Sequence, residues 1–489
     1  MNVELSYGPL AAVMISLLGT VPILLSDRNP NLRESWTVLI SLGKFSIIAS
    51  MLPAVLAGGG YRFTLAEVLP GVAIALRVDA MGMYFALVAS FLWILTSIYS
   101  IGYMRALDEH DQTRYYASFA VAMSATVGVA FSANLLTLYL FYEMLSLSTY
   151  PLVTHKQDAE ARSAGRKYLT YLLGTSVALT LPAMILIYSL TGTLDFTAGG
   201  ILAGKADPST VSILLVLLVF GFAKAAVMPL HGWLPAAMVA PTPVSSFLHG
   251  VAVVKVGVFS ILRMVFFVFG TGLLGDLNLG AVLTTLASVT ILGASLVALT
   301  QDNLKRRLAY STIGQLSYMI LGAGMLTAAG MTGGLLHLSM HAFGKITLFL
   351  CAGAIYIAAR KSNISEMDGL GRRMPVTYAA FFLASLSIIG MPPLGGFLSK
   401  WSMVIGAIDG GQLLLVAVVL VSSLLNAAYF FPIVYRGFFA RPAEGCGPEE
   451  IREAPVLCLI PLGVTALFCL VLFLWPSLAL QLIQRVLSP

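Results

Sequence analysis

The chain has 489 residues, of which 58% are hydrophobic and only 10% are charged. Soluble globular proteins are about 25% charged, and apolar runs of membrane-spanning length recur along most of this sequence, so we predict an all-α polytopic membrane protein. The net charge of +6 is modest, and we assign it to loop lysines and arginines rather than to a nucleic-acid-binding face.

Fourteen membrane-spanning helices are predicted from the apolar runs. Their approximate ranges are 8–25, 36–57, 79–104, 115–132, 134–154, 166–190, 209–238, 243–267, 279–301, 308–328, 332–358, 374–408, 411–436 and 455–478. We divide the chain into residues 1–114 with the first three helices, two five-helix units at 115–267 and 268–436, and residues 437–489 with a polar loop and the last helix. No separate soluble domain is expected.

The first three predicted helices contain few candidate functional residues. The first apolar run follows Glu4 rather than a basic segment, so we interpret it as a retained span and not as a cleaved signal peptide. Lys44 lies near one end of the second span, where a lysine can extend its ammonium group to the membrane surface. We therefore predict that Lys44 reaches water and has no role in transport.

The first five-helix unit contains three ionisable residues at central depths. Glu143 interrupts the fifth span, "LTLYLFYEMLSLSTYPLV", Lys224 lies in the seventh and Lys255 in the eighth, six residues after His249. A charged side chain at the bilayer centre costs about 2.5–3.5 kcal/mol on insertion scales, so such residues are usually paired or functional. Either a structural ion pair or an ion-transport pathway accounts for them, and we favour the pathway.

The second five-helix unit repeats this pattern. His337, His341 and Lys345 follow one another at four-residue intervals in the eleventh span, "HLSMHAFGKITLF", and therefore share one helical face. Imidazole exchanges protons near neutral pH, so this face is typical of a proton relay rather than of simple packing. Lys400 follows the sequence "GMPPLGG" in the twelfth span.

Prolines are predicted to break the seventh and twelfth spans. Pro229 follows Lys224 by five residues, and Pro392 and Pro393 precede Lys400. Proline removes a backbone donor, and inside a membrane the freed carbonyl groups need protein or water partners. The two breaks are five spans apart, so we expect two five-helix repeats, spans 4–8 and 9–13, of inverted topology.

The loops predict an orientation. When the fourteen spans alternate, 18 of the 28 Lys and Arg residues fall on one side and five on the other, with the remaining five lysines inside spans. The positive-inside rule then places both termini outside and residues 155–165, 302–307 and 436–454 in the cytoplasm, with residues 191–208 outside. Cys446 lies in the last of the cytoplasmic loops.

Four segments together resemble a known family. They are "FYEMLSLSTYPLV", "KAAVMPLHGWLPAAMVAPTPVSSFLHG", "LKRRLAYSTIGQLSYM" and "HAFGKITLFLCAGAIY". They are similar to the antiporter-like subunits of respiratory complex I, of Mrp cation/proton antiporters and of energy-converting hydrogenases. The resemblance covers nearly the whole chain, and "LHGVAVVKVGVFSILR" most resembles the D-type component of the Mrp antiporters or its hydrogenase counterpart.

The resemblance implies a fourteen-helix fold with a central polar axis. In the family pattern Glu143 and Lys224 form an ion pair, Lys255 is the central relay and Lys400 is the terminal lysine. The connecting positions are matched by His249, His337, His341 and Lys345. Some complex I subunits carry glutamate at the position of Lys400.

Two functions remain open from the sequence. The first is a proton-translocating subunit of a multisubunit monovalent cation (Na⁺)/proton antiporter in the cell membrane. The second is a proton-pumping membrane subunit of an energy-converting hydrogenase or of a complex I-like NADH/quinone oxidoreductase. We expect partner membrane subunits and no cofactor or metal, because no Cys/His cluster has ligand spacing and no nucleotide-binding motif occurs. Redox catalysis, where it occurs, would lie in partner subunits.

Overall fold

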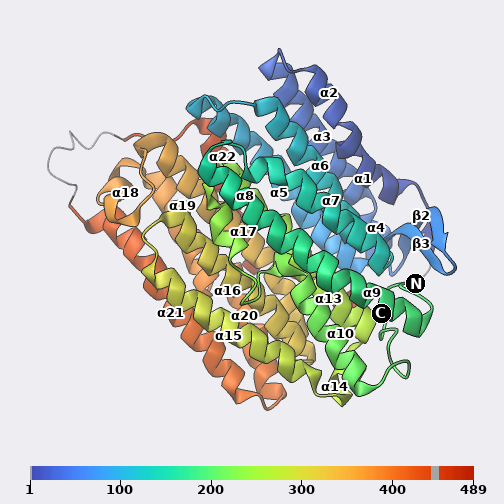
Figure 1. Cartoon of the computed structure of the whole chain (residues 1–489). Helices are drawn as coiled ribbons and strands as arrows, with labels where there is room; N and C mark the ends of the chain where they lie inside the picture. The colour runs from blue at the N-terminus through green and yellow to red at the C-terminus, as the bar shows by residue number, and fades with distance from the viewer. Residues whose placement is uncertain (1–2, 442–450, 489) are drawn as a thin grey trace.

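The computed structural model describes residues 3–441 and 451–488, so Cys446 lies outside the described residues. The described chain is mostly helical, and its long helices run side by side (Figure 1). Within the described ranges, nine helices are long and apolar enough to cross a membrane. The predicted class, a polytopic α-helical membrane protein, is confirmed. Each of the fourteen predicted ranges contains at least one helix.

Residues 8–107 form the first helices. Their bounds are α1 Gly8–Leu18, α2 Thr20–Leu25, α3 Pro30–Ser50, α4 Leu52–Leu56 and α5 Ala80–Leu107. Side-chain caps define where two of them begin: Asn29 accepts a hydrogen bond from the backbone N–H of Leu32, and Asp79 from that of Gly82. Such caps satisfy N–H groups that have no partner within the helix.

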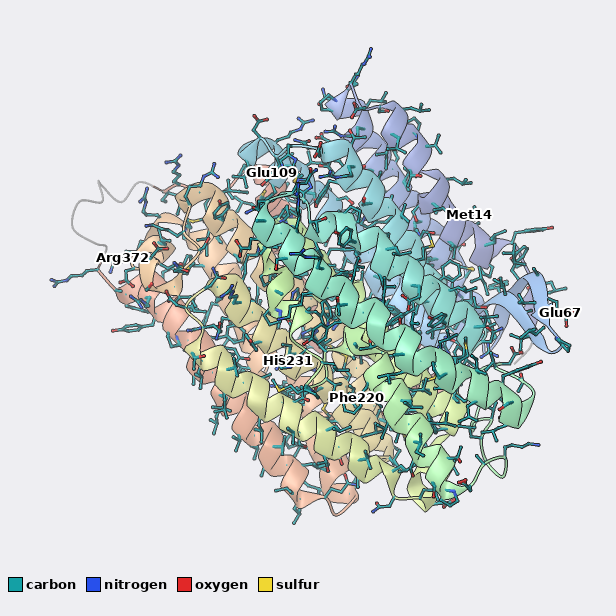
Figure 2. The ribbon with its side chains drawn as sticks, in the orientation of Figure 1. Met14, Glu67, Glu109, Phe220, His231 and Arg372 are labelled. Atoms are coloured by element: carbon teal, nitrogen blue, oxygen red, sulfur yellow. The ribbon has the colours of Figure 1, made fainter. Side chains whose placement is uncertain are left out.

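A small sheet precedes α5, in a stretch where no regular structure was predicted. Strand β1, Val3–Leu5, pairs in parallel with β2, Gly60–Leu69, and β2 pairs antiparallel with β3, Val72–Val78. Gly71 takes a φ of +75° in the tight turn, a value that suits glycine. Glu67 lies on this hairpin, away from the helices (Figure 2). The short strands lack the length of the apolar helical runs, which is why they were missed.

The next part contains two interrupted spans. Its helices are α6 Gln112–Ala130, α7 Leu135–Val153, α8 Ala159–Thr175, α9 Leu181–Thr191, α10 Pro208–Gly221, α11 Trp233–Ala236, α12 Thr242–Gly250 and α13 Val253–Met264. Short 3₁₀ or π segments join them at η1 Ser176–Thr180, η2 Ala223–Ala225, η3 Ala237–Val239 and η4 Val265–Phe269. A break in the seventh predicted span was expected at Pro229, and the helix already ends at Gly221, before Lys224. A break at Val251 and Ala252, between α12 and α13, was not predicted.

The remaining helices complete the bundle. They are α14 Thr271–Asp276, α15 Leu279–Thr300, α16 Leu304–Gly324, α17 Ala328–Ala359, α18 Leu370–Arg373, α19 Pro375–Ile389, α20 Gly395–Asp409, α21 Leu413–Phe439, α22 Val456–Leu474 and α23 Ser477–Leu487, with the 3₁₀ turn η5 Ile364–Glu366. The 32-residue α17 packs against α5, α12, α16, α19, α20 and α22. It is therefore the central helix of the second half, and it carries His337, His341 and Lys345.

Loops that are far apart in sequence meet at the two ends of the bundle. At one end, Asp302 accepts hydrogen bonds from Ser365, and Asp368 pairs with Arg436 at 2.6 Å. At the other end, Arg77 donates to the backbone carbonyl of Phe196, and β2, β3 and both chain ends lie together (Figure 1). These contacts bring distant loops together at each end of the bundle, and the alternation of fourteen spans stays a prediction.

Lys44 does not reach water, and the prediction that it snorkels is wrong. Its side chain is fully buried on α3 and its Nζ donates to the backbone carbonyl of Met123 on α6, at 3.2 Å. Lys44 lies near one end of its predicted span, which suggested that it reaches the membrane surface. Whether it reaches water depends instead on the face of α3 from which its side chain projects. The face of α3 that carries Lys44 packs against protein instead of lipid.

Candidate functional site

The ionisable residues predicted from the sequence lie inside the helix bundle. Glu143 is half-buried on α7. The others are at most 4% exposed: Lys224, His249, Lys255, His337, His341, Lys345 and Lys400. Buried charged groups need polar partners, since solvation by water is lost. The partners of each side chain therefore show which of these residues act together.

Lys224 lies at the point where the seventh predicted span unwinds. Its Nζ donates to the backbone carbonyl of Tyr142 at 2.8 Å and to Ser146 Oγ at 2.6 Å, and it lies 3.1 Å from the centroid of the Tyr142 ring. The indole N–H of Trp233 donates to the carbonyl of Ala223, at 3.0 Å. Protein groups thus satisfy a backbone carbonyl that the helix break leaves free.

Glu143 and Lys224, for which the resemblance implies an ion pair, are linked through the hydroxyl group of Ser146. Ser146 Oγ accepts from Lys224 Nζ and lies 3.4 Å from Glu143 Oε2. The other carboxylate oxygen, Oε1, is buried and has no hydrogen-bond partner among the described residues. A one-hydroxyl bridge weakens the attraction relative to contact, and it leaves the carboxylate able to approach the lysine.

Lys255 begins the second group of contacts. It follows the break at Val251 and Ala252, and its Nζ contacts His341 Nδ1 on α17. Gly257, on the same helix, packs directly on the Lys224 segment, where an added Cβ would lie 2.7 Å from Lys224 Cβ. The backbones of the two lysine segments are therefore adjacent.

From Lys255, a line of neighbouring polar side chains continues along α17 through His341 and His337. Their rings stack with centroids 5.8 Å apart, and His341 Nε2 has no hydrogen-bond partner within the described structure. His337 Nε2 lies 3.1 Å from Gln315 Oε1 on α16, and its Nδ1 lies 2.8 Å from Ser399 Oγ on α20. The two histidines therefore connect Lys255 to residues of two other helices.

Close packing of α16 against α17 makes the Gln315 contact possible. A Cβ at Gly322 would lie 2.7 Å from Gly334 Cα, so only glycine permits this approach of the two backbones. Gln315 lies two turns before Gly322, on the same side of α16 that faces α17.

Lys400 ends the line at the second helix break. Its Nζ donates to the carbonyl of Ile389, the last residue of α19, at 2.9 Å, and to Ser423 Oγ at 3.0 Å. With the Asn426 amide oriented to satisfy its neighbours, its oxygen accepts from Lys400 Nζ at 3.2 Å and from Gln315 Nε2 at 3.0 Å. Gln315 and Asn426 thereby connect His337 with Lys400.

Two of the predicted residues lie beside this line. Lys345 Nζ donates to the carbonyl of Leu308 at 3.3 Å and lies 5.4 Å from the Phe430 ring centroid. Both ring nitrogens of His249 lack a hydrogen-bond partner among the described residues, and the ring packs on Phe349. The expected relay face of α17 therefore contributes two histidines to the line, while Lys345 points to α16.

A second buried charge pair was not predicted from the sequence. Arg263 is fully buried on α13 and donates to both carboxylate oxygens of Asp79, at 2.5 and 2.7 Å. Arg263 is one of the five basic residues that the positive-inside count placed outside the spans, on the non-cytoplasmic side, and its full burial shows that treating it as a loop residue was wrong. Arg263 lies near the end of an apolar run, which suggested that its side chain was exposed. Its partner Asp79 lies 184 positions away in the sequence, so the buried pair could not be recognised from neighbouring residues.

Residues 132–426 match the family described as NADH:quinone oxidoreductase/Mrp antiporter, TM. The chain belongs to this family. The predicted family resemblance is thereby confirmed, and the chain is an antiporter-like membrane subunit.

Individual relatives cover nearly the whole chain. NADH-quinone oxidoreductase subunit N of Desulforudis audaxviator (strain MP104C) is 32% identical over 446 residues, which are 88% of this chain and 87% of that protein. A subunit in the structure of the membrane-bound sulfane sulfur reductase, an archaeal respiratory membrane complex, has a TM-score of 0.87 and 27% identity over 98% of this chain and 97% of its own. The Mrp complex from Dietzia sp. DQ12-45-1b matches with a TM-score of 0.86 over 98% of this chain and 96% of its own; at 22% identity it shows the fold alone.

Proposed function

We propose that this chain translocates protons as one subunit of a multisubunit membrane complex. The observation that carries the proposal is the buried line from Lys255 through His341, His337, Gln315 and Asn426 to Lys400. Lysine and histidine take up and release protons, and burial in a bundle core excludes competing exchange with bulk water. Gln315 and Asn426 do not titrate, so their role is to orient His337 and Lys400 and the water that carries protons between them.

Glu143, Ser146 and Lys224 form the proposed switch of this path. Burial disfavours a charged lysine, whereas an approaching carboxylate favours it. Movement of Glu143 by one side-chain rotamer toward Lys224 would therefore favour protonation of Lys224, and withdrawal would favour release toward Lys255. Family membership and the adjacency of the Lys224 and Lys255 segments support this order.

Variants of Glu143 test the proposed function. Glu143→Asp keeps the charge but shortens the side chain, so we expect proton-coupled transport to fall about tenfold or less. Glu143→Ala should fall to the leak rate, because no carboxylate then acts on Lys224. The assay is quenching of a pH-sensitive dye in inverted vesicles, normalised to assembled complex. Full transport by assembled Glu143→Ala would reduce this carboxylate to a structural role.

We infer fourteen spans with both termini outside and inverted repeats at spans 4–8 and 9–13. The unwound segments beside Lys224 and Lys400 support the repeats, and the uneven distribution of Lys and Arg supports the orientation. The corresponding units are residues 115–267 and 268–436, preceded by 1–114 and followed by 437–489.

Single cysteines test this topology. Cys351, Cys458 and Cys469 are buried, so Cys446→Ser supplies a low-background chain for Lys156→Cys and Lys205→Cys, both at exposed positions. An impermeant maleimide should label position 205 in right-side-out vesicles and position 156 only in inverted ones. The opposite pattern would reverse the proposed orientation.

The parent complex is proposed to be a Na⁺/proton antiporter in the cell membrane. Membership of a family whose description includes the Mrp antiporters supports this assignment. The second candidate is a proton-pumping subunit of an energy-converting respiratory complex, favoured by the similarity to the NADH-quinone oxidoreductase protein and to the sulfane sulfur reductase complex. Purification of the native complex distinguishes them, because only the second candidate requires iron–sulfur and catalytic subunits alongside the membrane subunits.

A further inference from the structure

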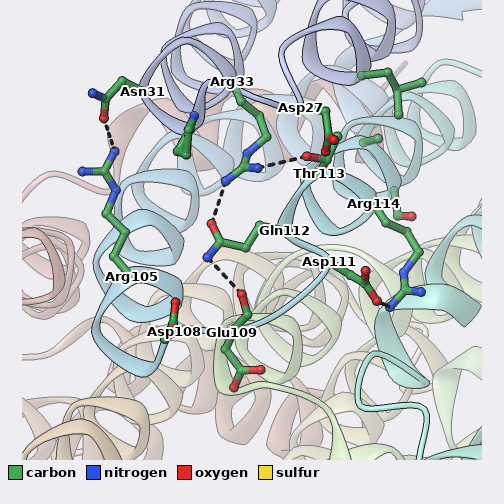
Figure 3. A pocket seen from close by; sticks show the side chains of 14 residues that line it. Asp27, Asn31, Arg33, Arg105, Asp108, Glu109, Asp111, Gln112, Thr113 and Arg114 are labelled. Atoms are coloured by element: carbon green, nitrogen blue, oxygen red, sulfur yellow. Dashed lines mark hydrogen bonds and ion pairs between the residues drawn. The ribbon is translucent and has the colours of Figure 1, made fainter.

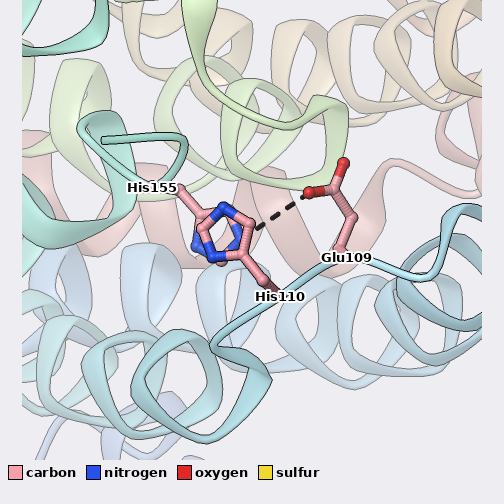
Figure 4. A group of neighbouring side chains, drawn as sticks. All are labelled: Glu109, His110 and His155. Atoms are coloured by element: carbon pink, nitrogen blue, oxygen red, sulfur yellow. Dashed lines mark ion pairs between the residues drawn. The ribbon is translucent and has the colours of Figure 1, made fainter. Parts of the chain in front are cut away.

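A histidine and carboxylate cluster lies at one end of the bundle, apart from the buried line. Glu109 and His110 belong to the connection between α5 and α6, and His155 follows the end of α7 by two residues. Figure 4 shows the three side chains together. One potential ligand atom from each lies within 4.8 Å of the others.

His155 is a buried imidazole without hydrogen bonds. Its side chain is 0% exposed, and both ring nitrogens lack a hydrogen-bond partner among the described residues. Its Nε2 lies 3.8 Å from Glu109 Oε2. An unpaired imidazole facing a carboxylate has the chemistry of a metal ligand.

His110 presents a second imidazole beside a carboxylate. Its Nδ1 lies 3.0 Å from Asp111 Oδ2, which leaves Nε2 available. A carboxylate that accepts from the other ring nitrogen is the usual outer partner of a metal-bound histidine. The His110 and His155 rings stack at 4.8 Å with 9° between their planes. Because a metal lies in the plane of each imidazole it binds, His110, whose side chain is 50% exposed, must turn out of this stack.

Two cavities border the Glu109 side of this cluster, and nearby carboxylates supply compensating charge. Glu109 lines a cavity of about 1110 Å³, shown in Figure 3, and a neighbouring one of about 470 Å³. The positive charge of Arg114 disfavours a cation at this site, because its guanidinium lies close by: it pairs with Asp111 at 3.0 Å and donates to the carbonyl of His155. The carboxylates of Glu109 and Asp111 offset that charge.

We propose that Glu109, His110 and His155 form a binding site for a divalent transition metal of the Zn²⁺ class. Two imidazole nitrogens and one carboxylate oxygen are a ligand set that such ions favour, with water in the fourth position. Asp111 positions His110. The bound ion would join the α5–α6 connection to the end of α7.

Zn²⁺ itself is the probe. The purified complex, with affinity tags removed and Cys446→Ser introduced, is titrated with Zn²⁺ by calorimetry. We expect one saturable site per chain with a first shell of nitrogen and oxygen in X-ray absorption. His110→Ala and His155→Ala should each weaken binding at least about tenfold, and Asp111→Asn about tenfold, as for the loss of an outer partner. His231→Ala, a half-buried histidine in the segment after Lys224, is the matched control and should bind as the parent does.

His110 and Asp111 are exposed, so their variants decide the question even where His155→Ala does not assemble. Equal affinity in the parent and His110→Ala chains, or no saturable Zn²⁺ binding in the parent, would overturn the proposed site.

Discussion

Asp79→Ala is expected to lower the free energy of unfolding by about 3–5 kcal/mol, the effect of removing one partner from a buried ion pair. Arg263 is fully buried and is held by both oxygens of Asp79. The same carboxylate accepts from the N–H of Gly82 at the start of α5. Its loss would leave a guanidinium without its charge partner inside the protein. Denaturant titration in detergent micelles measures the change.

An exposed pair supplies the matched control for Asp79. Asp195 and Arg62 are 3.7 Å apart, with side chains 37% and 36% exposed, and such pairs contribute about 0–1 kcal/mol. Asp195→Ala should therefore cost far less than Asp79→Ala. The double variant Asp79→Leu with Arg263→Met removes the two charges of this pair, while Arg77, 3.6 Å from Asp79 and partly exposed, also loses its partner, so the variant should recover part of the loss. Equal costs for Asp79→Ala and Asp195→Ala would contradict a stabilising buried pair.

Lys255→Met is expected to reduce proton-coupled transport to the rate of vesicles without the complex. Methionine keeps the approximate volume of lysine but carries no proton, so the contact with His341 Nδ1 is lost. Lys255→Arg should also fail, because guanidinium keeps its proton in proteins. Dye-monitored proton flux, normalised to assembled complex, is the measurement.

Lys44 gives this prediction its matched control. It is another fully buried lysine, but its Nζ donates to the carbonyl of Met123, away from the line. Lys44→Met should therefore retain most of the transport in assembled complex. If Lys44→Met and Lys255→Met lose transport equally, loss of any buried lysine explains the result, and a specific relay role for Lys255 fails.

The sequence predicted the parts of the fold that depend on long apolar runs and on rare residues. Each predicted helical range contains a helix, Lys224 lies at the first break expected from a proline, and the ammonium group of Lys400, on α20, reaches the second break at the end of α19. These features are local, since run length and proline position are read directly along the chain. The β2–β3 hairpin was missed because its short strands carry a weaker signal.

The partners of the buried charges could not be predicted in the same way. Asp79 and Arg263 come from helices that are far apart in sequence, and the burial of Lys44 depends on which face of α3 meets α6. Ser146, Gln315 and Asn426 are neutral residues whose importance appears only through contacts with Lys224, His337 and Lys400. The Gln315 contact depends in addition on the close approach of Gly322 to Gly334.

The central claim is that Lys255 and Lys400 act in series on one proton path. Its most direct test is proton flux through reconstituted complex carrying Lys255→Met, Lys400→Met or both, each normalised to assembled protein. Groups in one path are non-additive, so we predict that each single variant stops flux and that the double variant is no slower than either. Substantial flux in both single variants, lost only in the double variant, would show two parallel routes and contradict a single path in series.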